Sequence, residues 1–166
     1  MYSLSMPTEI ERKFLVDPTK LPKPSLRVHL HQGYMSLASP VVRVRIQEYV
    51  EPPIPPQAFL TIKGPGSMVR PEFEYSIPLE HAREMWPMVK FEVRKWRSTI
   101  PCYEISNVNK HWSVDEFLGP LQGLWVAEIE LDGPDDPVVL EPWLGREVTD
   151  DPRYANTWLA EHGIPV

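Results

Sequence analysis

The stretch TEIERKFLV, residues 8–16, decides the fold because its charges, apart from the off-pattern Arg12, fall at every second position. On an α-helix, residues two apart point to nearly opposite sides, whereas on a β-strand they share one face, about 6.6 Å apart. The charged face of such a strand would hold Glu9, Glu11 and Lys13, and the other face would hold Ile10 and Phe14. The pattern therefore predicts a strand with one charged and one apolar face.

The same alternation recurs along the chain and predicts about eight strands. They are expected at 8–16, 27–38, 41–50, 58–64, 70–78, 91–99, 110–118 and 124–132. The further charged rows on them are Arg43 and Arg45; Lys63; Arg70, Glu72 and Glu74; Lys95 and Arg97; Asp115; and Glu128 and Glu130. Many strands with few helices predict a mainly β (α+β) chain with an antiparallel sheet, open or closed into a barrel.

Only short helices fit between the strands, because twenty prolines punctuate the chain. One helix is expected at 80–89, after Pro78, and a helical turn at 137–143. A last helix is expected to be capped by Asp151, with Pro152 in its first turn and Gly163 after its end. The proline-rich segment 50–57 is expected to be an exposed loop; a docking site for a proline-binding partner is the minor alternative.

The composition bounds the class of protein. A chain of 166 residues with 42% hydrophobic and 24% charged residues suits a single domain spanning 1–166. One cysteine, Cys102, excludes a disulfide framework and a cysteine metal cluster. No apolar run approaches the roughly 18 residues of a membrane span, and the start of the chain lacks a signal-peptide pattern. We therefore expect a cytoplasmic protein.

The net charge of −6 argues against broad attraction to nucleic acid, but the charged rows carry more information than the total. Taken singly, each row suits a sheet with one solvated face. Taken together, the rows are sorted by sign, and threonine, serine and glutamine are scarce at these positions. If the apolar faces pack outward, seven acids and six cations, with Arg70 not counted among them, meet inside a closed barrel, where they need pairing or a ligand.

The residue types in these rows predict a metal–phosphate site. Carboxylates in i, i+2 pairs suit a hard cation such as Mg²⁺ or Mn²⁺, and arginine forks suit phosphate oxygens. The chain has no Walker-type glycine loop with lysine and no Gly-x-Ser-x-Gly, and its five histidines show no zinc spacing. A P-loop enzyme, a serine hydrolase of that type and a zinc site are therefore disfavoured.

These motifs resemble the triphosphate tunnel metalloenzymes of the CYTH superfamily. The opening carries their Glu-x-Glu-x-Lys signature, and the resemblance continues through VVRVRI, LTIKG, RPEFEYSI, the Lys95-x-Arg97 pair, VDEF, VAEIEL and WLGREVTDDPRYAN. It covers nearly the whole chain, in order. It implies an eight-stranded antiparallel β-barrel tunnel with a few short helices packed outside, which holds a triphosphate end to end.

The resemblance also implies roles for individual residues. The metal-binding acids would be Glu9, Glu11, Asp115, Glu128 and Glu130. The phosphate-binding cations would be Lys13, Arg43, Arg45, Lys63, Lys95 and Arg97. Catalysis would fall to Glu9, Glu11, Lys13 and Lys95, with Tyr34 at the tunnel mouth as an assistant or else an ordinary aromatic strand residue. Arg70, Glu72 and Glu74 would line the tunnel.

Among family members the chain is most similar to short bacterial-type inorganic tripolyphosphatases. The resemblance implies metal-dependent hydrolysis of inorganic triphosphate, with Mg²⁺ or Mn²⁺ as cofactor. The alternatives are hydrolysis of thiamine or nucleoside triphosphates, an adenylate-cyclase-like activity, a non-catalytic polyphosphate binder, and a plain barrel with its charges outward. Three segments depart from the family pattern: the turn at 64–66, the loop at 50–57 and the long hairpin at 100–110. The family pattern therefore does not predict the structure of the tunnel rim.

Overall fold

The computed structural model describes residues 8–51, 53–102 and 110–166, and all eight expected strands are present in it. They are β1 (Thr8–Val16), β2 (Leu26–Ser36), β3 (Val41–Tyr49), β4 (Gln57–Lys63), β5 (Val69–Ile77), β6 (Phe91–Pro101), β7 (His111–Phe117) and β8 (Trp125–Glu130). Most of the expected 100–110 hairpin lies outside the described residues. The strand predictions are confirmed, with ends that agree or shift by one or two residues.

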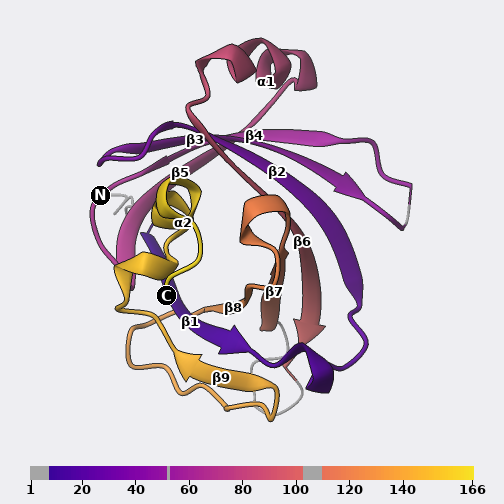
Figure 1. Ribbon diagram of the computed structural model, residues 1–166, viewed down its shortest axis with the longest axis vertical. Helices are drawn as coiled ribbons and strands as arrows, with labels where there is room; N and C mark the ends of the chain where they lie inside the picture. The colour runs from indigo at the N-terminus through magenta and orange to yellow at the C-terminus, as the bar shows by residue number, and fades with distance from the viewer. Residues whose placement is uncertain (1–7, 52, 103–109) are drawn as a thin grey trace, which may run out of the picture.

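The strands close into an antiparallel barrel through β1 (Figure 1). The order around the sheet is β5-β4-β3-β2-β6-β7-β8-β1, and β1 then pairs with β5. One edge of β1 pairs with β8 from Glu11 to Leu15. The other edge is divided: Thr8–Ile10 pair with β5, whereas Phe14 and Val16 pair with a ninth strand, β9 (Leu144–Glu147). The eight-stranded barrel is confirmed, and β9 is an addition that the sequence did not predict.

The helices match the sequence less closely. Helix α1 (Leu79–Met85) ends earlier than expected and passes into the 3₁₀ turn η2 (Trp86–Met88); two further 3₁₀ turns are η1 (Pro18–Lys20) and η3 (Gly119–Leu121). The helical turn predicted at 137–143 is wrong, since residues 137–141 have no helical hydrogen bonding and Pro142–Trp143 form a turn before β9. Pro137 and Pro142 lack backbone N–H donors and disfavour helix in the residues before them.

The last helix is broken in two. Asp151 caps the 3₁₀ turn η4 (Pro152–Tyr154) by accepting a hydrogen bond from the Arg153 backbone N–H. Helix α2 (Asn156–His162) begins after Ala155 and ends at Gly163, whose φ of 84° suits a residue without a Cβ. The predicted cap and end are therefore confirmed, but the expected continuous helix is wrong.

Two apolar clusters cover the outside of the barrel. Phe14, Trp112, Ile129 and Trp143 pack the outer faces of β1, β7 and β8 under the segment that leads into β9. Val44, Ala58 and Ala82 pack α1 onto β3 and β4, the layer at the top of Figure 1. Because these apolar faces point outward, the alternating charged faces point into the barrel.

A third cluster fills one end of the barrel from the inside. Val93 lies two residues before Lys95, Phe117 two after Asp115 and Val126 two before Glu128, so they share the charged face. Leu159 of α2 and Tyr154 of η4 pack on them, and Figure 1 shows α2 in front of the opening that the strands surround. Helix α2 therefore covers one end of the barrel.

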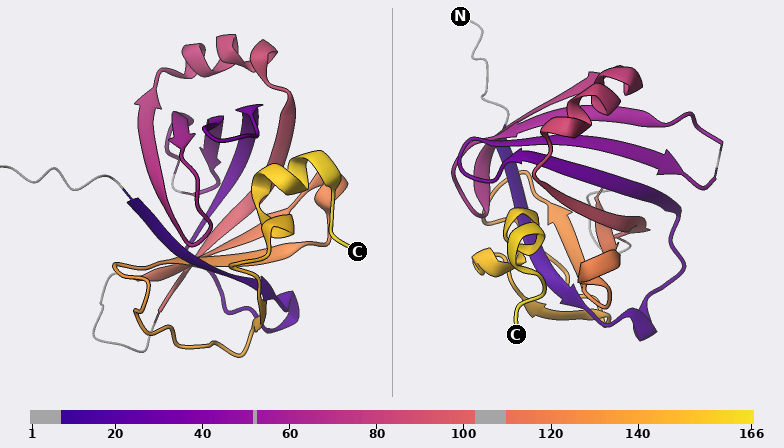
Figure 2. Two further views of the ribbon diagram at one scale, coloured as in Figure 1. Left: turned by 90° about the vertical axis from the view of Figure 1, so that its left-hand side faces the viewer. Right: turned by 45° about the horizontal axis from the view of Figure 1, so that its top comes forward.

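One close contact fixes β2 against the segment that follows η2. A Cβ atom built on Gly33 would lie 2.5 Å from Val89 Cγ2 and 3.3 Å from the ring of Trp86. Figure 2 shows how the α1 region arches from β5 to β6 above the β2–β4 layer. Across residues 8–51, 53–102 and 110–166, no helix has the length and apolar character needed to span a membrane.

Candidate active site in the barrel interior

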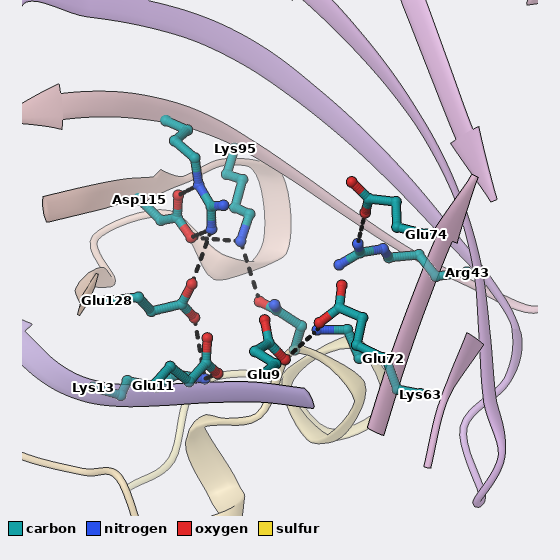
Figure 3. A network of polar contacts seen from close by, with 12 residues as sticks. Glu9, Glu11, Lys13, Arg43, Lys63, Glu72, Glu74, Lys95, Asp115 and Glu128 are labelled. Atoms are coloured by element: carbon teal, nitrogen blue, oxygen red, sulfur yellow. Dashed lines mark hydrogen bonds and ion pairs between the residues drawn. The ribbon is translucent and has the colours of Figure 1, made fainter. Parts of the chain in front are cut away.

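Charged side chains from all sides of the barrel point toward one another in its interior (Figure 3). Strands β1 and β8 are neighbours and carry the acids Glu9, Glu11 and Glu128, whereas β3 lies across the ring and carries Arg43 and Arg45. This arrangement follows from the period-two pattern of each strand combined with the closed order of the sheet. The predicted charged rows, apart from the exposed Glu130, therefore come together in one charged interior.

The most deeply buried group is an ion-pair cluster around Asp115. Its carboxylate accepts hydrogen bonds from Lys95 Nζ and from Arg97 Nε (2.7 Å) and Nη2 (2.8 Å), and Asp115 and Lys95 have no exposed surface. Arg97 Nη2 also donates to Glu128 at 3.0 Å. Burial lowers the pKa of Lys95 to about 8, because Asp115 offsets only part of the cost of desolvation. Both oxygens of Asp115 are engaged by cations.

Glu11 lies beside Glu128 in a crowded part of the acidic wall. Burial, and then the charge of Glu128, raise the pKa of Glu11 to about 7. Lys13 Nζ lies 3.2 Å from Glu128 but 3.9 Å from Glu11, so the shared cation serves Glu128 better. Burial raises the pKa of Glu128 as well, but Lys13 and Arg97 outweigh it and hold that pKa well below its usual range. Glu11 is therefore the least compensated buried acid here.

Glu9 belongs to a second cluster, at the β1–β5 closure. It accepts hydrogen bonds from Lys63 Nζ (2.9 Å) and Arg70 Nε (3.0 Å), and Lys63 also lies 2.9 Å from Glu72. Burial raises the pKa of Glu9, but a hydrogen bond with Glu72 and the charges of Lys63 and Arg70 bring it down to about 2. Burial and the same hydrogen bond raise the pKa of Glu72. Arg70 thus adds a seventh cation to the predicted six.

The arginine pair of β3 meets an acid from β5. Glu74 accepts hydrogen bonds from Arg43 Nη2 (3.2 Å), Arg45 Nη2 (3.1 Å) and the hydroxyl of Thr61 (3.0 Å). Thr61 is fully buried and also accepts a hydrogen bond from Arg43 at 3.0 Å. Thr61 was not among the predicted site residues, although its position two residues before Lys63 places it on the same face.

The segment after β9 supplies polar groups that the strand pattern did not predict. A cavity of about 80 Å³ lies between this segment and β1–β5, lined by Lys13, Tyr34 and Arg43 from the barrel and by Thr149, Asn156 and Thr157 from the segment. Asn156 Oδ1 lies 3.5 Å from Lys95 Nζ. Burial raises the pKa of Tyr34, against the opposing charge of Arg43. The only sequence signal for Asn156 was its place at the end of the motif WLGREVTDDPRYAN.

The remaining predicted site residue, Glu130, lies opposite Glu11 in the β1–β8 register but is exposed. Within the described part of the chain, no cation pairs with it, and no group of three or more acids, histidines or cysteines is gathered closely enough to hold a metal. Glu11 nevertheless lies near Glu9 and Glu128, whose charges raise its pKa, and opposite Glu130 in the strand register, so four carboxylates with oxygen donors line this part of β1 and β8. This donor chemistry fits a hard divalent cation.

A closed antiparallel barrel with acids on one wall and arginines on the opposite wall defines a class of charged-tunnel proteins. Within this class the chain belongs to the CYTH domain family, whose model matches residues 7–155. It is 37% identical to an inorganic triphosphatase of Acetivibrio thermocellus, covering 95% of this chain and 96% of that protein. It is 31% identical to an inorganic triphosphatase of Nitrosomonas europaea, covering 92% and 97%.

Solved structures agree with the fold. The crystal structure of the inorganic triphosphatase NE1496 matches with a TM-score of 0.58 at 30% identity, over 92% of this chain and 93% of that one. A putative adenylyl cyclase from Hippeastrum with a dominant triphosphatase activity matches with a TM-score of 0.54 at 16% identity, over 76% and 81%. The second likeness supports the barrel alone.

Proposed function

We propose that this protein hydrolyses inorganic triphosphate to diphosphate and phosphate in a metal-dependent reaction inside the barrel. The observation that carries the proposal is the meeting of a carboxylate wall, on β1 and β8, with an arginine pair across the ring, on β3. A polyanion and a cation together satisfy both walls, whereas either alone leaves one wall uncompensated. The names of the two bacterial relatives support the same activity.

The cations would bind and straighten the phosphate chain. Arginine forks at Arg43 and Arg45 suit phosphate oxygens, and Lys63 adds a point charge beside them. Lys13, Lys95 and Arg97 face the same interior and would offset the charge that builds on the leaving diphosphate. Phosphoryl transfer needs positioning and charge neutralisation more than covalent help, and these residues supply both.

The acids would hold Mg²⁺ or Mn²⁺. Glu9, Glu11, Glu128 and Glu130 offer the oxygen ligands that such ions prefer. A bound divalent ion supplies charge withdrawal from phosphate oxygens and activation of water. The predicted contribution of Asp115 to this set would require release of Lys95 or Arg97, which both hold its oxygens.

Inorganic triphosphate is our proposed substrate in preference to organic triphosphates. Both of its ends carry free phosphate oxygens, whereas an ester blocks one end of ATP. Stacking of a nucleotide base would need an accessible aromatic side chain, but Trp112 is 1% exposed and packs edge-on against Phe14 and Trp143 outside the barrel. It is therefore unable to stack a base. We propose that the reaction takes place in the cytoplasm, as a single-domain enzyme, without nucleic acid.

The test is phosphate release from inorganic triphosphate, ATP, GTP and thiamine triphosphate, each with Mg²⁺, with Mn²⁺ and with excess EDTA. We expect kcat/KM for inorganic triphosphate to lead by more than tenfold and activity to vanish in EDTA. Full activity in EDTA would overturn the metal assignment. A lead below tenfold, or a lead by another triphosphate, would overturn the substrate assignment alone.

A further inference from the structure

Glu74 holds the two guanidinium groups that the proposed function assigns to substrate phosphate. Its two carboxylate oxygens are divided between them, with Oε2 on Arg43 and Oε1 on Arg45. The hydroxyl of Thr61 donates to Oε2 and so fixes the carboxylate in this bridging position. The carboxylate thus bridges the two guanidinium groups through one contact to each, at the place where the proposed function puts a substrate phosphate.

One carboxylate only partly satisfies this arginine pair. Within the described part of the chain, the buried Nε atoms of Arg43 and Arg45 have no hydrogen-bond acceptor. Burial, and then the charge of Arg43, lower the pKa of Arg45 to about 10. Two guanidiniums share a single negative charge, so a phosphate group with more charge and more acceptor oxygens would satisfy them better than Glu74 does.

The exposure of the three side chains shows which one can leave. The side chains of Arg43 and Arg45 are 8% and 13% exposed, whereas that of Glu74 is 33% exposed. The Glu74 side chain is already partly in contact with solvent, so it can turn further outward with less change in its surroundings than either arginine. The cavity beside Arg43, about 80 Å³, is also well below the roughly 300 Å³ at the lower end of ligand pockets. An anion that binds the same atoms of Arg43 and Arg45 consequently has to displace Glu74.

We propose that Glu74 is a built-in competing anion: substrate phosphate displaces it from Arg43 and Arg45, and it returns when product leaves. The proposal rests on the proposed function, because it assumes that the arginine pair binds phosphate. Every anion that binds at this pair must displace the same carboxylate, so Glu74 weakens the affinity for substrate and for product alike.

The test is calorimetric binding of inorganic triphosphate and of diphosphate in EDTA to the wild type and Glu74→Gln. We expect Glu74→Gln to lower both dissociation constants about tenfold, and to lower KM for triphosphate with Mg²⁺. Glu74→Asp keeps the charge but is one methylene too short to bridge both arginines, so we expect it to recover part of that gain. An effect of charge alone would instead leave Glu74→Asp equal to the wild type.

The matched control is Glu116→Gln. Glu116 pairs with Arg27 on the outer face, has a similarly exposed side chain (31%) and loses the same charge, so its dissociation constants should stay within twofold of the wild type. Unchanged or weaker binding by Glu74→Gln would overturn the proposal, and weaker binding would make Glu74 a positioning residue for the arginines. If the wild type neither binds nor hydrolyses triphosphate, the proposed function itself fails.

Discussion

At the scale of single residues, the interior is a set of charges that compensate one another unequally. Asp115 is saturated by Lys95 and Arg97, whereas Glu11 is left with distant cations and a neighbouring acid. Removing one member of a buried pair usually costs more than the pair contributes, because the other charge stays buried. Substitutions inside this barrel should therefore differ strongly in effect, although they all change one charge.

Loss of Arg43 or Arg45 should lower kcat/KM for inorganic triphosphate. Arg43→Ala or Arg45→Ala removes a charged hydrogen bond to phosphate, about 1.5–3 kcal/mol, which corresponds to a fall in kcat/KM of roughly 10–150-fold. Lysine should rescue only in part, because it lacks the planar fork. Steady-state kinetics with inorganic triphosphate measure both. Unchanged kinetics in the Arg43→Lys, Arg45→Lys double variant would remove these residues from the site.

The raised pKa of Glu11 predicts a pH-dependent stability. The folded protein holds the Glu11 proton up to about pH 7, whereas the unfolded chain releases it near 4.5, so the free energy of unfolding falls as pH rises through this window. Glu11→Gln cannot ionise and should be more stable than the wild type at pH 8 and equal to it near pH 4.5. Urea unfolding in EDTA at both pH values tests this; an equal difference at both would contradict it.

The sequence predicted which face of its strand a charged side chain takes, but it did not predict which ion pairs that side chain forms. Period two correctly placed Glu9, Glu11 and Lys13 inside the barrel, because the geometry of one strand decides which face a side chain takes. It had no means to show that Glu9 pairs with Lys63 and Arg70, or that Glu130 is exposed, because those facts depend on strand order and register.

At the scale of elements, long strands with a clear alternation of charged and apolar residues were predicted, and short elements were missed. Strands of six to eleven residues with clear alternation were found, whereas β9 was not, since its four residues carry only Leu144 as an apolar signal. The break between η4 and α2 was missed for a different reason. The motif Asp151-Pro152 is a sound helix start, but it signals only the first turn and not whether a longer helix follows.

Packing between β2 and the η2–β6 connection should be sensitive to a single methyl group. Gly33→Ala places a Cβ 2.5 Å from Val89 Cγ2, so the core must shift, at a cost of about 1–3 kcal/mol. Because the φ of Gly33 is not positive, backbone strain plays no part. The free energy of unfolding of Gly33→Ala, Val89→Ala and the double variant measures this. The double variant should lose less than the sum of the singles; strict additivity would contradict the contact.

At the scale of the whole molecule, closure converts separate charged strands into one site. No single strand specifies a tunnel, since each charged face alone also suits solvent. The closed order, with β1 joined to both β5 and β8, places the acidic wall across from the arginines, and α2 covers one end. The closed barrel was predicted from the family motifs, whereas the periodicity alone predicted an antiparallel sheet that could be open or closed.

A ligand that contacts both the acidic wall of β1 and β8 and the arginine pair of β3 should stabilise the whole barrel against unfolding. Inorganic triphosphate at 100 times its dissociation constant should add about 2.7 kcal/mol to the free energy of unfolding, a rise in Tm of roughly 5–11 °C for a chain of this size. Orthophosphate at the same concentration and ionic strength should raise Tm less, since it spans only part of the interior. Thermal unfolding in EDTA gives the comparison, with Arg43→Ala expected to lose most of the shift. Equal shifts from both anions would indicate a salt effect.

The divided pairing of β1 also has a consequence during synthesis. This first described strand meets β8 only after residues 125–130 have left the ribosome, and β9 later still. At ordinary translation rates, roughly 6–23 s pass between the emergence of Val16 and that of Glu130. Throughout that time the edge of β1 that pairs with β8 has no partner strand. The apolar face of β1, with Ile10 and Phe14, also lacks the packing that β8 provides. Its charged face then acts as a protection, because a strand with Glu9, Glu11 and Lys13 pairs poorly with copies of itself on neighbouring ribosomes.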